Sequence, residues 1–131
     1  MKLTVDALNK SGGFTGGPVK KHVNWMNEGD ELTADVWIRP MSYHTAVKDL
    51  SAFQDGGDIV AQRIALCVCD EDGAPVFQVS DITGYDKDGK PIKVKGDDGK
   101  MIERGPLNKE LADALMLLVS EVSGLGKSKK S

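Results

Sequence analysis

The stretch LNKELADALMLLVSEVSG, residues 107–124, predicts a long amphipathic C-terminal helix against which the rest of the chain must pack. Asn108 can cap its start, and Gly124 is a typical residue to end it. Apolar residues recur every three or four positions, which is the spacing of one helix face. They are Leu107, Leu111, Leu115, Leu118 and Val122.

A second apolar stripe, Ala112, Met116 and Val119, lies beside the first on the same predicted helix. A helix that is apolar around more than half of its circumference has to be buried on two sides. In a chain of 131 residues, another subunit can supply one of those sides. These three residues are therefore candidate contacts in a homo-oligomer.

Two runs with a period of two predict a β-hairpin upstream of this helix. VKKHVNWM (19–26) and LTADVWIRP (32–40) each place apolar residues on one side, and NEGDE (27–31) predicts a turn between them. Trp37 instead falls on the polar face with Arg39. A Trp beside an Arg is typical of interfaces, so both residues are candidate partner contacts. The alternative is a hairpin with both faces partly covered.

Two further helices are predicted between the hairpin and the C-terminal helix. Ser42 can cap the first, and Asp58 can cap the second, IVAQRIALCVC (59–69). The segments RIALCVC and VFQV around DEDGAP also fit a strand pair, because periodicity alone does not separate the two for short apolar runs. We favour the helix. Helical spacing in the first segment relates Tyr43, Val47, Leu50 and Phe53.

These elements predict an α+β fold in which an N-terminal β-hairpin packs with about three helices. Residues 1–18 form a flexible Gly-rich arm, residues 19–123 a single domain, and residues 124–131 a disordered tail. Residues 84–105 are rich in Asp, Gly and Lys, and predict a protruding loop or a small hairpin that turns at GDDG.

Composition excludes several classes of protein. A net charge of −3 and a pI near 5.3 argue against a nucleic-acid or anionic-membrane binder. No apolar run approaches the ~20 residues of a membrane span, and no signal-peptide pattern opens the chain. The two cysteines, in Cys67-Val68-Cys69, are too close in sequence for bridging geometry. We expect an intracellular, soluble protein.

No motif in the sequence indicates catalysis or the binding of a metal or cofactor. GLGKS (124–128) ends like a phosphate-binding loop, but the opening glycine of that motif would fall at Glu121, and a helix precedes the stretch instead of following it. The Asp-Gly stretches that end at Gly73, Gly89 and Gly99 fail the ligand pattern of a calcium-binding EF-hand. Cys67 and Cys69 are too closely spaced for structural zinc and fit small buried hydrophobes better. We expect a binding or assembly protein and not an enzyme.

Three stretches carry a resemblance to a known family: WIRPMSYHTAVKDL, RIALCVCDEDGAPVF and GPLNKELADALMLLVSEVSGLGK. Together they resemble the tail assembly chaperones of long-tailed, lambdoid-type bacteriophages, from about Val19 to Lys127. The stretch between Tyr85 and Arg104 is longer than the resemblance leads us to expect and is interpreted as an inserted loop.

The resemblance implies a protein that acts in the cytoplasm of the infected host, self-associates and coats the long helical tape measure protein until tail tube subunits polymerise around it. Such proteins leave before the virion is complete. A ribosomal frameshift near the gene's end typically yields a longer product that recruits tail tube protein. Gly126-Lys127 is the candidate frameshift position, and Lys129-Lys130 is a second.

Two other functions remain open at this point. One is a virion structural protein, such as a tail tube or head–tail joining subunit, which would persist in the finished particle. The other is a small oligomeric enzyme or nucleotide binder, since absent motifs do not exclude a novel site.

Substituting Leu115→Asp should abolish soluble folding, because it places an unpaired charge on the face of the C-terminal helix that must be buried. Solubility and circular dichroism of the purified variant measure this. A soluble variant with the spectrum of the parent chain would contradict the helix prediction.

Overall fold

The computed structural model describes residues 2–54 and 58–123, without the side chains of residues 52 and 53. The predicted α+β fold is confirmed, with five helices in the described residues where about three were expected. The order is α1 (Val5–Ser11), β1 (Val19–Asn27), β2 (Asp30–Ile38), α2 (Tyr43–Gln54), α3 (Ile59–Cys67), β3 (Val68–Cys69), α4 (Val79–Thr83), β4 (Lys93–Lys95), β5 (Met101–Glu103) and α5 (Lys109–Ser123).

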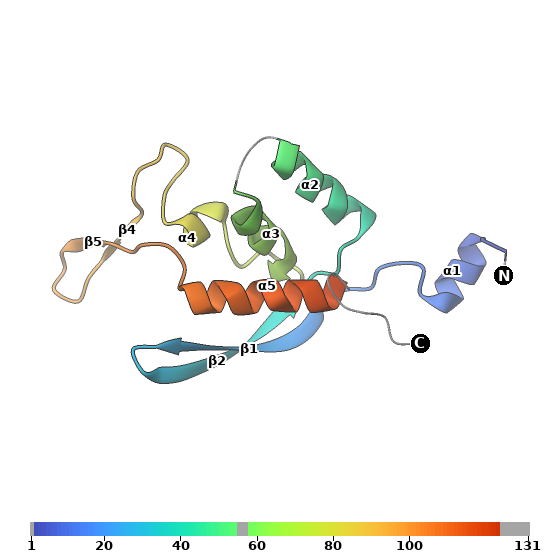
Figure 1. Ribbon diagram of the computed structural model, residues 1–131, viewed down its shortest axis with the longest axis horizontal. Coiled ribbons are helices and arrows are strands. Elements are labelled where there is room, and N and C mark those ends of the chain that lie inside the picture. Colours follow the sequence, from blue (N-terminus) through green and yellow to red (C-terminus); the bar gives the residue numbers. More distant parts are fainter. Residues whose placement is uncertain (1, 55–57, 124–131) are drawn as a thin grey trace.

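Helix α5 lies at the centre of the molecule, between the β1–β2 hairpin on one side and α3 on the other (Figure 1). Leu115 is 2 % exposed and Val119 is fully buried. The expected burial on two sides is therefore met in large part by the chain itself. The core around α5 consists of Val23, Val36, Ile38, Ala61, Ile64, Cys67, Val68, Ile82, Leu115 and Val119.

The predicted hairpin is present, with Asn27 paired to Asp30 across a two-residue turn. Glu28 and Gly29 both have positive φ, 52° and 86°, which is the geometry of a type I′ turn and matches the twist of the strands. Near the turn, the N–H of Met26 on the outer edge of β1 donates to the carboxylate of Glu110 at 3.2 Å. The start of α5 thus covers part of the sheet edge.

All three predicted helix caps are confirmed. The Ser42 hydroxyl accepts the N–H of Thr45 at 3.3 Å, at the start of α2. Asp58 accepts the N–H of Ala61 at 2.9 Å, at the start of α3. Asn108 caps α5 in the same way, by accepting the N–H of Leu111 at 3.0 Å. Each side chain satisfies one of the amides that a first helical turn leaves unpaired.

The helix predicted over residues 59–69 is correct only as far as Cys67. Residues Val68 and Cys69 are extended and pair with Ile38 and Trp37 of β2, which makes β3 the third strand of the sheet. The alternative, a strand pair between RIALCVC and VFQV, is wrong, because the extended residues pair with β2 and Val79 of VFQV begins helix α4. Helix α3 ends at Cys67 because β2 supplies hydrogen-bond partners that Val68 and Cys69 can reach once they are extended.

Residues 84–105 contain the smaller predicted feature, a hairpin. Strands β4 and β5 pair antiparallel, with Lys95 opposite Met101, so the chain turns within residues 96–100. Two earlier turns, at Asp70 and at Asp86, share one pattern: the aspartate accepts the N–H groups two and four residues later, at 2.9 Å each. These carboxylates stabilise their own turns.

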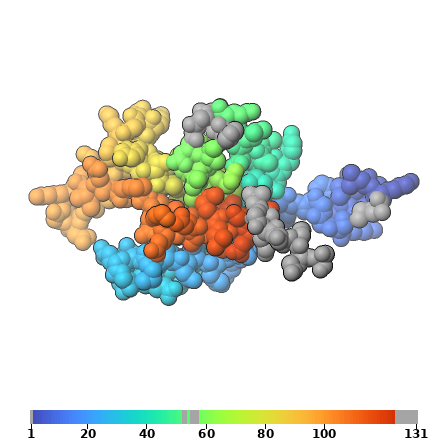
Figure 2. All heavy atoms as spheres, in the orientation of Figure 1, coloured from blue at the N-terminus to red at the C-terminus, as the bar shows by residue number. Residues whose placement is uncertain are grey.

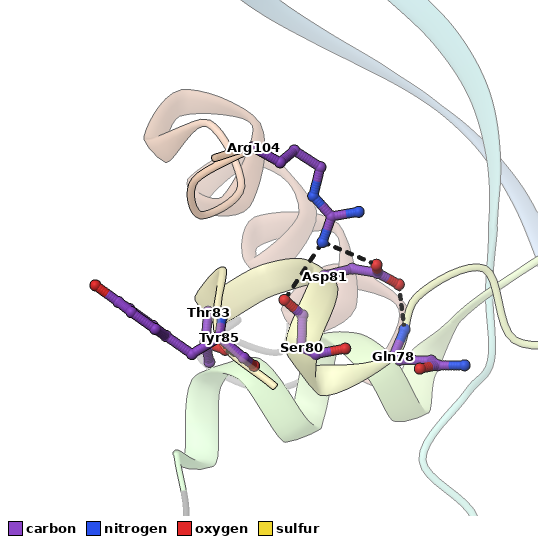
Figure 3. A network of polar contacts seen from close by, with 6 residues as sticks. All are labelled: Gln78, Ser80, Asp81, Thr83, Tyr85 and Arg104. Carbon is purple, nitrogen blue, oxygen red and sulfur yellow. Dashed lines mark hydrogen bonds and ion pairs between the residues drawn. The ribbon is translucent and has the colours of Figure 1, made fainter. Parts of the chain in front are cut away.

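The short helix α4, which the sequence did not predict, lies at the start of the segment 84–105, and its contacts fix both ends of that segment (Figure 3). Asp81 accepts the N–H of Gln78 at 2.8 Å and forms an ion pair with Arg104 at 3.1 Å. The N–H of Leu107 donates to the carbonyl of Ile82 at 3.0 Å. The chain leaves the body and returns to it at the same place, so the hairpin protrudes without disturbing the core.

Within the N-terminal arm, residues 5–11 form helix α1, which the sequence did not predict. Thr4 caps its start, Gly12 ends it, and none of its residues is buried. It stands apart from the body at one end of the molecule (Figures 1 and 2). The predicted tail, residues 124–131, lies outside the described residues. No helix within the described ranges is long and apolar enough to cross a membrane.

Gly84→Ala should lower the free energy of unfolding by about 2–5 kcal/mol, through a left-handed backbone strain of about 1–2 kcal/mol and a steric clash. Gly84 has a φ of 86°, and an added Cβ would lie 2.7 Å from the backbone nitrogen of Pro106. Urea denaturation of the purified chain measures the loss.

Gly89→Ala is the matched control, because Gly89 has a similar φ of 79° but open space around it. This variant should lose only the strain of about 1–2 kcal/mol. Equal losses in the two variants would mean that residues 84 and 106 are not in close contact.

Candidate interaction surface

Helix α2 turns its apolar side chains toward solvent. Tyr43 is 87 % exposed, Val47 is 49 % exposed and Leu50 is 56 % exposed. We call these three residues the α2 stripe. The spacing of four and three residues puts them on one side of the helix, and such a stripe ordinarily faces the core of its own protein. The fourth residue at that spacing, Phe53, has a side chain outside the described part of the structure.

The side of α2 that faces the body is polar. Thr45 is only 2 % exposed and exchanges a hydrogen bond with the hydroxyl of Ser42 at 3.1 Å. One turn further on, Asp49 accepts two hydrogen bonds from the guanidinium of Arg63 on α3, at 3.0 and 2.6 Å. The hydrogen bond to Asp49 raises the pKa of Arg63 above its ordinary value, although desolvation opposes it.

This ion pair decides which way α2 faces. Rotating α2 to bury the stripe would carry Asp49 away and leave the half-buried Arg63 without its partner. Leaving a partly buried charge without its partner is destabilising, even where the pair itself contributes little net stability. The α2 stripe therefore stays at the surface for a structural reason.

A groove runs between α2, α3 and the segment that leads into α4. It consists of two adjoining hollows of about 450 and 370 Å³, which share Lys48, Ala65, Leu66 and Pro75 as lining residues. We call it the α2–α3 groove. Thr15 and Gly16 of the arm line one end, and Phe77 and Val79 line the other. Its lining mixes apolar residues such as Leu66 with polar ones such as Lys48, and the groove and the α2 stripe lie on opposite sides of α2.

The interface candidates Trp37, on β2, and Arg39, just after it, lie on the outer face of the hairpin and beside this groove respectively. Trp37 is half-buried, and the ammonium of Lys20 lies 5.6 Å from the centre of its ring. Arg39 lines the groove and donates to the carbonyl of Gly73. Alternation along β2 places Trp37 on the face of the sheet opposite to α5.

The candidates on α5 are not brought together with those on β2. Ala112 and Met116 are half-buried beside the core, and Val119 is fully buried within it. The side chain of Val119 is therefore occupied by contacts within its own chain. A partner contact through Ala112 or Met116, as through Trp37 or Arg39, stays a prediction. The candidate frameshift position, Gly126-Lys127, lies outside the described residues.

Both cysteines are buried and carry free thiols. Desolvation, reinforced by the nearby charge of Asp49, raises the pKa of Cys67 to about 11, so its thiol stays protonated at neutral pH. A protonated, buried thiol is a poor nucleophile and a poor metal ligand. Among residues 2–54 and 58–123, no group of three His, Cys, Asp or Glu side chains could hold a metal ion.

The sequence did not identify the α2 stripe as a surface, although a signal was present. Thr45 and Asp49 follow each other at a spacing of four, which gives α2 a second, polar face. Arg63, on the next helix, offers that face a charged partner. A helix with one apolar face and one polar face that can form an ion pair can pack with either face inward. Only the folded structure therefore shows which face is buried.

Comparison with known proteins places the whole folded region in one family. No curated protein and no solved structure matches the chain. A family described as "Phage tail assembly chaperone, TAC" matches residues 6–123, which include every strand, most of the arm and the whole of α5. The chain therefore belongs to the family of phage tail assembly chaperones.

Proposed function

We propose that this chaperone binds the tape measure protein of a long-tailed phage during tail assembly, and that it does so through the α2 stripe. Membership of the family supports a role with tail proteins in the infected host. The observation that carries the finer proposal is the orientation of α2, whose polar contacts with the body leave Tyr43, Val47 and Leu50 exposed.

The chemistry of the stripe fits an amphipathic helix as its partner. Residues spaced by four and three positions form the kind of ridge that packs into the apolar face of a second helix. Burying the rest of these three side chains contributes about 3–6 kcal/mol, at roughly 1.5–3 kcal/mol for each fully exposed side chain, because Val47 and Leu50 are already about half covered. Association costs about 4–15 kcal/mol, so a single contact is weak.

Weak single contacts suit a chaperone that must leave. Many copies along one long helix gain affinity through multivalency, and a polymerising tube can displace them one at a time. On this proposal the chaperone self-associates, coats the tape measure protein in the host cytoplasm and is absent from the mature virion. It performs no catalysis and binds neither nucleic acid nor membrane.

The proposal includes a longer, frameshifted product that recruits tail tube protein. Gly126-Lys127 is the position at which we expect the reading frame to change, because codons for this pair are compatible with a slippery sequence. Lys129-Lys130 is the second position. Sequencing the gene over residues 124–131 tests whether either pair has such codons.

Substituting Val47→Asp should weaken binding of the tape measure protein at least tenfold, because the new charge lies in the middle of the stripe. The variant should keep the unfolding temperature of the parent, since Val47 is half exposed and makes no core contact. Leu117→Asp on α5 is the matched control, because Leu117 is apolar and 63 % exposed. Equal weakening by both variants would place the contact elsewhere.

An antibody against the folded region distinguishes the assembly factor from a virion component. Applied to infected-cell lysate, it should detect a short and a longer band, and purified virions should contain neither. A single band that persists in virions would contradict the proposal and support the alternative, a structural subunit such as a tail tube or head–tail joining protein.

A further inference from the structure

The two hollows of the α2–α3 groove differ in chemistry. The hollow beside the arm, which we call the basic hollow, is lined by Arg39, His44 and Lys48, and none of the described residues that line it carries a carboxylate. The adjoining hollow exposes mostly apolar surface, to which Leu66 and Phe77 contribute. We call it the apolar hollow. One continuous groove therefore has a basic end and an apolar end.

The basic hollow reverses the sign of the chain as a whole, which has 20 acidic and 17 basic residues. Elsewhere, basic side chains such as Lys20 and Lys109 form ion pairs with carboxylates of the same chain. Within residues 2–54 and 58–123, no such ion pair involves Arg39, His44 or Lys48. A concave surface lined by one sign of charge attracts a ligand of the opposite sign.

Hydroxyl groups at the same end add hydrogen-bond donors. Ser42 and Thr45 line the basic hollow, and their hydroxyls are 3.1 Å apart, so one of their two protons is shared between them. The Ser42 hydroxyl also accepts the N–H of Thr45, which uses no proton. The second hydroxyl proton has no acceptor in the described part of the structure. An anion in this hollow can accept it.

The guanidinium of Arg39 is held at the edge of the basic hollow by its hydrogen bond to the carbonyl of Gly73. A guanidinium has five N–H donors in a fixed planar arrangement that matches a carboxylate. The bond to Gly73 uses one of them. Arg39 is therefore oriented by its own chain and keeps donors for a second partner.

The apolar hollow offers a different kind of contact. Leu66 and Phe77 are half-buried, and Val79 is 37 % exposed at the far end. Apolar surface that remains in contact with water is covered favourably by another apolar group. The volumes of the two hollows, about 450 and 370 Å³, lie within the range of about 300–1,000 Å³ that is typical of ligand sites.

We propose that the α2–α3 groove binds a protein segment in which acidic side chains lie next to apolar ones. The carboxylates bind Arg39 and Lys48 and accept the free hydroxyl proton, and the apolar side chains cover Leu66 and Phe77. A small inorganic anion would leave the apolar hollow exposed to water. A wholly apolar segment would cover the basic side chains without pairing them, which is costly.

This site goes beyond the proposed contact with the tape measure protein. It lies on the opposite side of α2 from the α2 stripe, and Val47 is not among its lining residues. Its ligand also differs in chemistry, because the stripe fits an apolar helix face and the groove requires carboxylates. The two surfaces can therefore be occupied and tested separately.

The test uses nuclear magnetic resonance of the full, ¹⁵N-labelled chain, titrated with short peptides blocked at both ends. The probe peptides have two glutamates next to leucine and phenylalanine, in either order, between glycines. At least one order should shift the amides of Lys48 and Leu66 until saturation. Replacing both glutamates by glutamine should weaken binding about tenfold or more, because the charge pairing is lost. Replacing leucine and phenylalanine by alanine should also weaken it.

Lys48→Glu should weaken binding of the acidic peptide about tenfold or more, because attraction becomes repulsion between like charges. The variant should keep the unfolding temperature of the parent, since Lys48 is exposed and forms no ion pair with a described residue. Lys100→Glu is the matched control, because Lys100 is an exposed lysine in the turn of the β4–β5 hairpin. It should bind like the parent.

Val79→Asp tests the apolar end in the same way and should weaken binding. An acidic residue in the first turn of α4 is compatible with that helix, and Val79 is outside the core. Val76→Asp is the matched control, because Val76 is 52 % exposed and does not line the groove. Its affinity for the peptide should equal that of the parent.

Three results would overturn the proposal. One is the absence of shifts with either peptide order at about 1 mM, where a millimolar Kd is detectable. Another is equal binding of the glutamine peptide, which would make the groove a purely apolar site. The third is equal binding of the alanine peptide together with its displacement by inorganic phosphate, which would leave only an anion site. Val47→Asp should bind the acidic peptide like the parent, so failure here leaves the contact with the tape measure protein untouched.

Discussion

Burial of α5 on two sides by its own chain is the constraint on which the other elements depend. Leu115 and Val119 face the sheet and α3 at once, so the hairpin and α3 are fixed relative to each other through α5. Polar groups on α5 then fix its position along the sheet. Glu110 and Asn108 bind the backbone of Met26 at one end, and Glu121 lies 3.8 Å from Lys21 near the other.

The elements outside this core are attached mainly by polar contacts. The ion pair between Asp49 and Arg63 orients helix α2. The ion pair between Asp81 and Arg104 positions the protruding segment 84–105. Such contacts specify geometry while adding little stability. Apolar residues on these elements are consequently free to face outward, as the α2 stripe and the arm do. A protein that holds a partner for a limited time needs such surfaces on a stable core.

The local features of the fold could be predicted from the sequence because each depends on a few neighbouring residues. The turn at Glu28-Gly29 and the caps at Ser42, Asp58 and Asn108 are of this kind. Helix α1 was missed because the glycines after it dominate the composition of the arm. Helix α4 is five residues long and is held by Arg104, which lies more than twenty residues away.

The candidate surface could not be predicted for a different reason. Which face of α2 packs against the body depends on an ion pair between α2 and α3. The sequence does not show whether the apolar face or the face that can form the ion pair is buried. Val119 belongs to a stripe for which the sequence suggested a subunit contact, whereas the chain's own elements bury this one side chain completely. In both cases long-range packing decides what local pattern leaves open.

The most direct test of the account is hydrogen exchange of the full chain, measured alone and in complex with the tape measure protein. The account predicts new protection of the amides in α2, residues 43–54, and no change in the already buried amides of α5. Unchanged exchange in α2, with protection appearing on the outer face of the hairpin around Trp37 instead, would contradict it.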